Sequence, residues 1–177
     1  MECARKLLEK IVTKQINDNI QAHDLLPMTQ FGSRPHHLAV DAAATLVHRI
    51  QATCAAKCAG ALLLFDISGF FDNVNPARTV QIFRDKGFPP GMCTWVKSFL
   101  SARKAMLKGG GHTSEPFEIS SGTPQGSPLS LILSVMYTAN LLEMTSTWTL
   151  RDLTMYIDDS IVQPYRCSGR LKQRTLL

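Results

Sequence analysis

Three aspartates stand where strands are expected to end, and their arrangement indicates phosphoryl or nucleotidyl transfer. Asp158 and Asp159 are adjacent between two short apolar runs, and Asp66 follows the apolar run that ends at Phe65. Carboxylates that meet at one turn repel one another unless a divalent metal ion lies between them. The residue types therefore predict a metal-dependent site for group transfer between phosphates.

An adjacent pair of aspartates also has a purely structural interpretation. Aspartate side chains hydrogen-bond to their own backbone, so such pairs are common in turns. For Asp158 and Asp159 alone this interpretation is favoured. Asp66, together with the segments around all three residues, favours the metal site instead.

Apolar periodicity predicts the elements that position these aspartates. Apolar residues recur at helical spacing from Leu8 to Ile20, which predicts an amphipathic helix. The unbroken apolar run 61–65 predicts a strand covered on both faces, with Asp66 at its carboxyl end. A hairpin over 153–161 is expected to turn at Asp158 and Asp159. Helices are predicted over residues 2–21, 38–59, 76–86, 92–100 and 129–143, and a second hairpin over 104–120.

Two of the helix predictions include particular side chains. In the helix over 92–100 the expected buried face consists of Trp95, Phe99 and Leu100. The helix over 129–143 is apolar enough to be largely buried, with Ser127 as its N-cap and Pro128 as its first residue. The turn segment that precedes it, from residue 122 to 128, is rich in glycine and proline.

Composition and charge favour one domain or a little more. The chain has 177 residues, of which 45% are hydrophobic, enough to bury a core. Lys and Arg number 19 and Asp and Glu 14, which leaves a formal charge of +5. This balance is compatible with a polyanionic partner without requiring one.

Cysteine spacing and the lack of targeting signals indicate a soluble intracellular protein. The five cysteines have neither the spacing of a zinc site nor that of a disulfide framework, which favours a reducing compartment. The N-terminus lacks the pattern of a signal peptide, and the longest apolar runs are too short or too polar to span a bilayer. No contact with a membrane is expected.

Four segments together resemble the conserved motifs of one enzyme family. The segments Phe65–Asp72, Gly122–Ser130 and Tyr156–Asp159 resemble the three central palm motifs of reverse transcriptases, in particular those of non-LTR (LINE-type) retrotransposons. The segment Thr29–Pro35, followed by Asp41, looks like the fingers motif of the same group. The resemblance runs from about residue 5 to residue 162, with the motifs in the family's order.

The resemblance implies an α+β fold with the right-hand arrangement of polymerases. Residues 1–60 would form part of the fingers, residues 61–163 a palm whose antiparallel sheet packs on helices, and residues 164–177 a basic tail. No segment resembles the thumb or the endonuclease domain of such enzymes. The chain therefore looks like a truncated fragment of a retrotransposon reverse transcriptase.

The resemblance also implies a set of site residues. Asp66 and Asp158, supported by Asp159, would be catalytic and would bind two Mg²⁺ ions, with Mn²⁺ as a substitute and Ile67 as a further metal ligand. Phe71 matches the position of the steric gate, an aromatic ring that leaves no room for a ribose 2′-hydroxyl. The implied nucleotide-binding residues are Ser68, Gly69, Phe70, Phe71, Gln125 and Gly126, and the implied template or primer contacts are Arg34, Gly122, Pro124 and Tyr156.

The family suggests one function, and two alternatives stay open. The first hypothesis is an RNA-directed DNA polymerase that uses dNTPs to extend a DNA primer on an RNA template, in the nucleus if it is part of a retrotransposon product. The alternative is an inactive retrotransposon remnant that keeps the fold and at most binds nucleic acid through its positive charge. A palm that uses a DNA template or ribonucleotides is disfavoured by Phe71.

Overall fold

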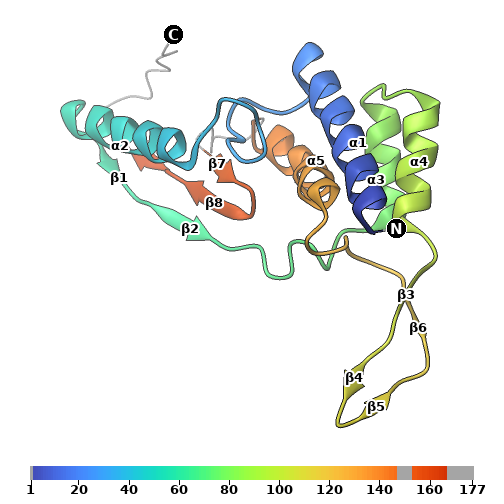
Figure 1. Cartoon of the computed structure of the whole chain (residues 1–177). Coiled ribbons are helices and arrows are strands. Elements are labelled where there is room, and N and C mark those ends of the chain that lie inside the picture. Colours follow the sequence, from blue (N-terminus) through green and yellow to red (C-terminus); the bar gives the residue numbers. More distant parts are fainter. Residues whose placement is uncertain (1, 147–152, 167–177) are drawn as a thin grey trace. The chain divides into compact units, whose positions relative to one another are not determined.

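A computed structural model describes residues 2–146 and 153–166, and these divide into two compact units. The helical unit comprises Met1–Pro27 and Ser68–Asn140, and the sheet unit comprises Met28–Ile67 and Leu141–Leu177. Both are discontinuous in sequence (Figure 1). The assignment of residues 1–60 to fingers and 61–163 to palm stays a prediction, and most of the basic tail lies outside the described residues.

The helical unit contains four of the five predicted helices within a few residues of their expected bounds, and the fifth, predicted over 38–59, lies in the sheet unit and ends at Ala55. A proline opens three of them, in keeping with the preference of proline for the first turn of a helix. Asn75 caps one of these helices, because its side chain accepts a hydrogen bond of 3.0 Å from the backbone N–H of Arg78. The helices are α1 (Glu2–Ala22), α3 (Pro76–Asp85), α4 (Pro90–Leu100) and α5 (Pro128–Ser146).

The buried faces of α1 and α4 differ in part from those predicted. On α1 the residues from Val12 to Ile20 at helical spacing are buried, but Leu8 is 49% exposed. On α4, Leu100 is buried as predicted, whereas Trp95 and Phe99 are half-buried and stack on each other with ring centroids 5.5 Å apart. The prediction for these two rings is wrong because the buried stripe of α4 runs through Cys93, Val96 and Leu100.

A long β-ribbon follows α4 and confirms the hairpin predicted between residues 104 and 120. Strand β3 (Arg103–Ala105) pairs antiparallel with β6 (Phe117–Ile119), and β4 (Lys108–Gly109) pairs with β5 (His112–Thr113). Two glycines with positive φ connect β4 and β5, as a tight hairpin turn requires. In Figure 1 the ribbon leads away from α4.

The sheet unit is built on three antiparallel strands in the order β2-β8-β7 (Figure 1). These are β2 (Leu63–Phe65), β8 (Asp159–Val162) and β7 (Leu153–Tyr156), and the two-stranded pair β1 (Ala59–Gly60) and β9 (Tyr165–Arg166) accompanies them.

Helix α2 (Ala39–Ala55) packs against the sheet unit's strands. It contacts β7 and β1, and Arg49 donates a hydrogen bond of 3.0 Å to the hydroxyl of Thr154. A small apolar core joins Leu142 to β7, with Ile67 and Val162 packed against it. The sheet that carries two of the candidate aspartates is therefore packed against α2 and against Leu142 near the end of α5.

Strand β2 differs from the prediction of a strand covered on both faces. Its side chains are exposed, with Leu64 at 69% and Phe65 at 53%. The strand lies at the edge of the described sheet, and α2 contacts β1 and β7 in place of β2. An apolar run is buried on both faces only where other layers cover both faces, so the sequence could not reveal the exposure.

Two further sequence inferences concern cysteines and membranes. Cys58 is disulfide-bonded, which differs from the reduced thiols that the cysteine spacing predicts, whereas Cys3, Cys54 and Cys93 are free. The spacing of cysteines along the sequence does not indicate which of them tertiary folding brings close enough to form a disulfide. In residues 2–146 and 153–166, no helix combines the length and the apolarity needed to cross a bilayer.

Candidate active site

The aspartate pair lies at the tight turn between β7 and β8. Tyr156 pairs with Asp159, so the two turn residues are Ile157 and Asp158, one position earlier than predicted. Asp159 is the first residue of β8. A two-residue hairpin loop holds its flanking residues in a fixed register, which limits where the Asp158 carboxylate can lie.

Asp66 reaches the same end of the sheet from the neighbouring strand. Strand β2 pairs antiparallel with β8, and its last registered pair is Phe65 with Ser160. Asp66 follows Phe65 directly, one residue beyond the end of β2. Asp66 and the Asp158 turn therefore lie at the same end of the sheet, and the convergence of the three carboxylates on one metal site stays a prediction. β8 is the middle strand of the sheet and β2 its edge.

The chemistry of the three aspartates fits a hard divalent cation. Asp66 and Asp159 are exposed and Asp158 is half-buried, and within the described ranges none of them forms an ion pair with Lys, Arg or His. Carboxylate oxygens without a cationic neighbour are the ligands that Mg²⁺ prefers. Across residues 2–146 and 153–166, the side chains do not gather three or more His, Cys, Asp or Glu into a metal-holding group. The donor type thus fits the metal, whereas the described side chains are not assembled around one.

Ile157 is held in a strained backbone conformation at the turn. Its φ is 62°, which lies in the left-handed region that β-branched residues rarely enter. A positive φ at the first central residue alone is typical of type II′ hairpin turns, where glycine is the favoured residue. Strain of this kind persists only where the surroundings enforce it, and it concentrates at functional sites.

The segment Thr29–Gly32 supplies those surroundings. Met155 of β7 donates a backbone hydrogen bond of 2.9 Å to Thr29 and accepts one of 2.8 Å from Phe31. Gln30, which is fully buried, accepts a hydrogen bond of 3.1 Å from the N–H of Gly32 through its side chain. The segment that resembles a fingers motif therefore runs along β7 as a parallel neighbour of the strand.

Gly32 lies directly against the turn. A Cβ atom built at Gly32 would lie 2.4 Å from the backbone nitrogen of Ile157 and 2.5 Å from its Cγ1. Side chains cannot occupy that space, so only glycine allows this approach. Gly32 is therefore a determinant of where the Asp158 turn lies.

Arg34 and Tyr156, two of the predicted template or primer contacts, also belong to the sheet unit. Both side chains are half-buried. The Arg34 guanidinium lies 3.8 Å from the sulfur of Met28. Tyr156 is the last residue of β7, beside the Asp158 turn.

The chain enters the helical unit at Ser68, where it forms a tight turn. Gly69 has a φ of 64°, and its carbonyl accepts a hydrogen bond of 2.9 Å from the N–H of Asn73. The Asn73 amide also donates a hydrogen bond of 3.1 Å to the carbonyl of Ser68. The turn is thus closed by Asn73, a residue that the sequence did not single out.

The two adjacent phenylalanines have different environments. Phe70 is 6% exposed and belongs to the core of the helical unit. Phe71 is half-buried, and the two rings meet edge to face with centroids 5.1 Å apart. The Phe71 ring is therefore partly accessible and contacts the buried Phe70 ring, and its role as a steric gate stays a prediction.

The Gln125 loop, defined as residues 121–127, is bonded to the phenylalanine segment. The N–H of Gly122 donates to the carbonyl of Val74 and the N–H of Thr123 donates to that of Phe71, both at 2.8 Å. Gly122 has a φ of 80°, and a Cβ there would lie 2.9 Å from the Cα and the carbonyl oxygen of Asp72. The predicted gate and the predicted loop are therefore one connected piece of the helical unit.

Ser127 and Pro128 begin α5 as the sequence predicts. The Ser127 hydroxyl accepts a hydrogen bond of 3.2 Å from the N–H of Leu129, which caps the helix. Gln125 and Gly126 are exposed and Pro124 is half-buried. The tip of the loop thus stays accessible while its end is fixed by a helix start.

The predicted site residues fall into two sets, one in each unit. The sheet unit holds Arg34, Asp66, Ile67, Tyr156, Asp158 and Asp159, and the helical unit holds Ser68, Gly69, Phe70, Phe71, Gly122, Pro124, Gln125 and Gly126. Sequence reasoning missed six residues that support them: four act through contacts distant in sequence, and two bond to residues only two to five positions away. These are Glu9, Gln30, Gly32, Asn73, Arg103 and Thr123.

Comparison with known proteins finds that the chain is similar in sequence to polymerases of transposons. Residues 1–164 match the family described as "Reverse transcriptase (RNA-dependent DNA polymerase)". The chain is 31% identical over 137 residues to the "Probable RNA-directed DNA polymerase from transposon BS" of Drosophila melanogaster, which covers 77% of this chain and 15% of that protein. It is 24% identical over 161 residues to the "Probable RNA-directed DNA polymerase from transposon X-element" of the same organism, covering 91% of this chain and 18% of that protein.

Proposed function

The chain belongs to the reverse transcriptase (RNA-dependent DNA polymerase) family, and on that premise we propose that it extends a DNA primer with dNTPs on an RNA template. The observation that carries the proposal is the pairing of Phe65 with Ser160, which puts Asp66 and the Asp158 turn at the same end of the sheet. The chain spans less than a fifth of either curated relative, 15% and 18%. The activity is therefore proposed for this chain as the part of such a polymerase that carries the aspartates.

Asp66 and Asp158 are the proposed ligands of two Mg²⁺ ions, with Asp159 in support and the backbone carbonyl of Ile67 as a further ligand. Mn²⁺, which takes the same oxygen ligands, would substitute. When bound, the metal ions lower the pKa of the primer 3′-hydroxyl and stabilise the pyrophosphate that leaves. The chain supplies the negative charge that holds them, at a turn fixed by Gly32.

The helical unit carries the residues proposed to receive the incoming nucleotide. Backbone N–H groups of the turn from Ser68 to Phe71 would bind the triphosphate, because consecutive amides in a turn form an anion site. Phe71 would exclude the 2′-hydroxyl, and the exposed Gln125 and Gly126 would contact the nucleotide. Contacts to template or primer are proposed for Arg34, Gly122, Pro124 and Tyr156.

The finer architecture and the origin of the chain belong to the same proposal. We propose that the helices and sheet are the fingers and palm of a right-hand polymerase. The transposon polymerases that the chain resembles support an origin in a non-LTR retrotransposon. A nuclear location would follow from that origin.

One observation favours a second candidate function, an inactive remnant that binds nucleic acid. Within the described ranges, the three aspartate side chains are not assembled into a group of metal ligands. The formal charge of +5 would then provide weak binding that depends on salt but not on sequence. Such a protein would bind a primer-template duplex without extending the primer.

Metal-dependent primer extension separates the two candidates. The purified chain, given an RNA template, a labelled DNA primer, dNTPs and Mg²⁺, is expected to add nucleotides, and excess EDTA is expected to stop the addition. The reason is that the proposed transfer needs the metal at the aspartates. Duplex binding measured in parallel with the same substrate supplies the control. Binding without any extension in Mg²⁺ or Mn²⁺ would favour the remnant.

Replacing Phe71 by alanine is expected to raise the use of ribonucleotides. Removing the half-buried ring opens the space beneath the sugar, and the ratio of kcat/KM for dNTP to that for NTP should fall by about tenfold or more. The measurement is single-nucleotide extension with matched dNTP and NTP. Phe71→Tyr keeps the ring and should keep the selectivity. An unchanged ratio in Phe71→Ala would show that Phe71 is not the gate.

A further inference from the structure

Both ends of the Gln125 loop are held by charged side chains that lie outside every motif of the site. One is Arg103 at the start of β3, and the other is Glu9 on α1. Both residues belong to the helical unit, as does the loop. Neither has a role in the proposed chemistry itself.

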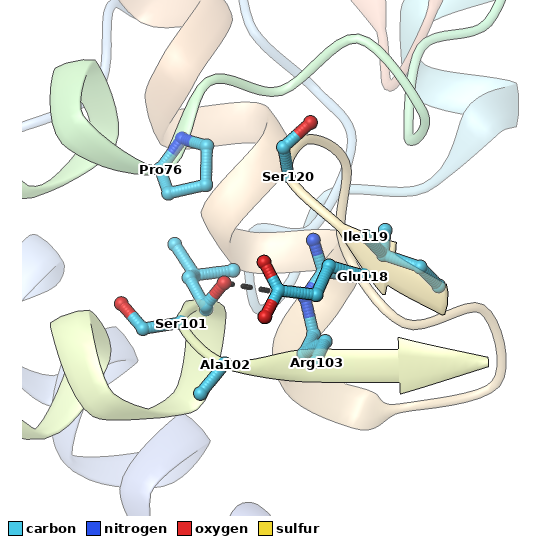
Figure 2. Close-up of a pocket in the computed structure, with 8 residues that line it drawn as sticks. Pro76, Ser101, Ala102, Arg103, Glu118, Ile119 and Ser120 are labelled. Atoms are coloured by element: carbon cyan, nitrogen blue, oxygen red, sulfur yellow. Dashed lines mark hydrogen bonds between the residues drawn. The ribbon is translucent and has the colours of Figure 1, made fainter. Parts of the chain in front are cut away.

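Arg103 binds the first end of the loop. Its Nη2 donates hydrogen bonds of 2.6 Å to the carbonyl of Ser121 and 2.7 Å to that of Gly122, and its Nε donates one of 3.2 Å to the carbonyl of Leu100. Figure 2 shows this side chain in the wall of a pocket of about 210 Å³ that Glu118 and Ser120 also line. A single guanidinium therefore joins the end of α4 to the start of the loop.

The geometry of these contacts requires arginine. A guanidinium presents several N–H donors in a rigid plane, whereas a lysine ammonium is a compact charge on a flexible stem. Burial lowers the pKa of the Arg103 guanidinium, but the group stays protonated at neutral pH because the ordinary pKa of arginine lies far above neutrality. Backbone carbonyls bonded to a charged donor are held more firmly than those bonded to a neutral one.

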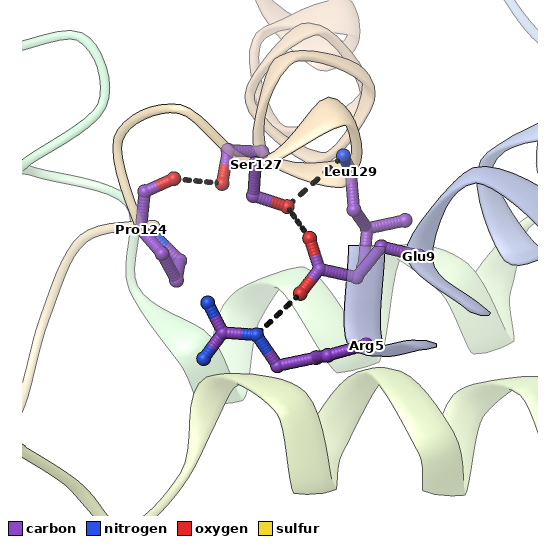
Figure 3. A network of polar contacts seen from close by, with 6 residues as sticks. Arg5, Glu9, Pro124, Ser127 and Leu129 are labelled. Carbon is purple, nitrogen blue, oxygen red and sulfur yellow. Dashed lines mark hydrogen bonds and ion pairs between the residues drawn. The ribbon is translucent and has the colours of Figure 1, made fainter. Parts of the chain in front are cut away.

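Glu9 binds the second end of the loop through Ser127 (Figure 3). The Ser127 hydroxyl donates a hydrogen bond of 2.7 Å to Glu9 Oε2, and the other carboxylate oxygen lies 3.4 Å from Nε of Arg5. Glu9 is 4% exposed, so this is a buried carboxylate whose oxygens are both partnered. Because the same hydroxyl accepts from Leu129, Glu9 fixes the point where the loop becomes α5.

The tip of the Gln125 loop, between the ends that Arg103 and Glu9 hold, is exposed. Gln125 and Gly126 are exposed, and a Cβ added at Gly126 would meet no heavy atom within 4 Å. Within the described residues the Gln125 side chain forms no hydrogen bond. Pro124 is held by a hydrogen bond from the hydroxyl of Ser130 to its carbonyl. The loop is thus fixed on both sides of two residues that are free to meet a ligand.

We propose that Arg103 and Glu9 are positioning residues that preorganise the Gln125 loop for the incoming nucleotide and its template base. This proposal rests on the proposed polymerase function. A loop already fixed in its binding conformation loses less conformational entropy when a ligand binds, so the anchors act on affinity. They touch neither the nucleotide nor the metal.

Hydrogen exchange tests the anchoring without any need for activity. In the full chain, the amides of residues 121–127 are expected to exchange about tenfold faster in Arg103→Met and in Glu9→Leu than in the unchanged chain. Arg103→Lys and Glu9→Gln should give intermediate rates, because Lys keeps a charged donor and Gln keeps an acceptor for Ser127. If Arg103→Met or Glu9→Leu impairs folding, the exchange rates of these two conservative variants still test the proposal.

Matched controls lie on the same two elements. Lys104→Met removes an exposed charge from β3, and Asp18→Asn removes one from an exposed pair with Lys14 on α1. Both should leave exchange in residues 121–127 unchanged. Equal exchange in Arg103→Met and Lys104→Met, or in Glu9→Leu and Asp18→Asn, would overturn the proposal.

Primer extension supplies the second readout. In an extending enzyme, the KM for dNTP should rise about tenfold in Arg103→Met and Glu9→Leu, with a smaller change in kcat, because the affinity of the loop changes and the aspartates do not. A fall in kcat alone would overturn the positioning role. If the unchanged chain shows no extension, the polymerase proposal fails, whereas the exchange rates still decide whether Arg103 and Glu9 hold the loop.

Discussion

Asp158→Asn is expected to reduce Mg²⁺-dependent primer extension by about a thousandfold or more, the largest effect of any single change in this chain. Asparagine has nearly the shape of aspartate, but it lacks the negative charge that holds a divalent cation. Asp158 is half-buried at a two-residue turn, so its replacement should change the free energy of unfolding by no more than about 0.5 kcal/mol. The rate of the first nucleotide addition is the quantity to measure.

Related substitutions show whether the effect is specific to the site. Asp66→Asn should cause a loss of similar size, and Asp159→Asn a smaller one, because Asp159 is assigned a supporting role. Asp85→Asn is the matched control, since Asp85 is an exposed aspartate of α3 whose Oδ1 accepts a hydrogen bond that asparagine can also accept. Equal rates in Asp158→Asn and Asp85→Asn would remove Asp158 from the metal site.

Gly32→Ala is expected to destabilise the sheet unit and to displace the turn that carries Asp158. The added Cβ would lie 2.4 Å from a backbone nitrogen, so the clash cannot be relieved by rotating a side chain. Overpacking of this kind costs about 1–3 kcal/mol. Urea unfolding followed by a probe in the sheet unit should show the loss, and primer extension should fall with it because the turn has moved.

Gly91→Ala provides the comparison for Gly32→Ala. Gly91 lies in α4, and a Cβ there would meet nothing within 4 Å. Alanine in a helix is favoured over glycine by about 1 kcal/mol, so this variant should be as stable as the unchanged chain or slightly more stable. If Gly32→Ala unfolds at the same urea concentration as Gly91→Ala, the close contact between Gly32 and Ile157 does not constrain the turn.

Local patterns predicted the helices and the two hairpins, because these depend on residues close in sequence. The helix start at Pro128 and the turn at Gly110 and Gly111 are examples of such local signals. The exposure of β2 could not be predicted in this way, since burial of an apolar strand depends on which layers lie above and below it. Trp95 and Phe99 were misplaced for a similar reason, because neighbouring elements decide which stripe of a helix is buried.

For the candidate site, the motifs predicted which residues meet at the strand ends but not what holds them there. Asp66 and Asp159 lie at the same end of the sheet because Phe65 pairs with Ser160, as the order of the motifs suggests. The left-handed backbone conformation of Ile157 could not be predicted from its residue type, because isoleucine is disfavoured in that conformation. One signal for Glu9 was present: an acidic residue at helical spacing from the buried Val12 and Ile16 points to a partner inside the protein.

The exposed strand β2 determines how copies of this chain behave when they are concentrated. Among the residues that the structure describes, β2 pairs along one edge, and an apolar strand with a free edge can pair with a strand from another molecule, which is the first step of aggregation. Such strands are commonly protected by a lysine or a proline, but Leu63, Leu64 and Phe65 include neither. Repulsion between molecules that each carry a formal charge of +5 opposes this pairing, and salt screens that repulsion. Solubility of the isolated chain is therefore set by the ionic strength of its buffer as much as by its fold.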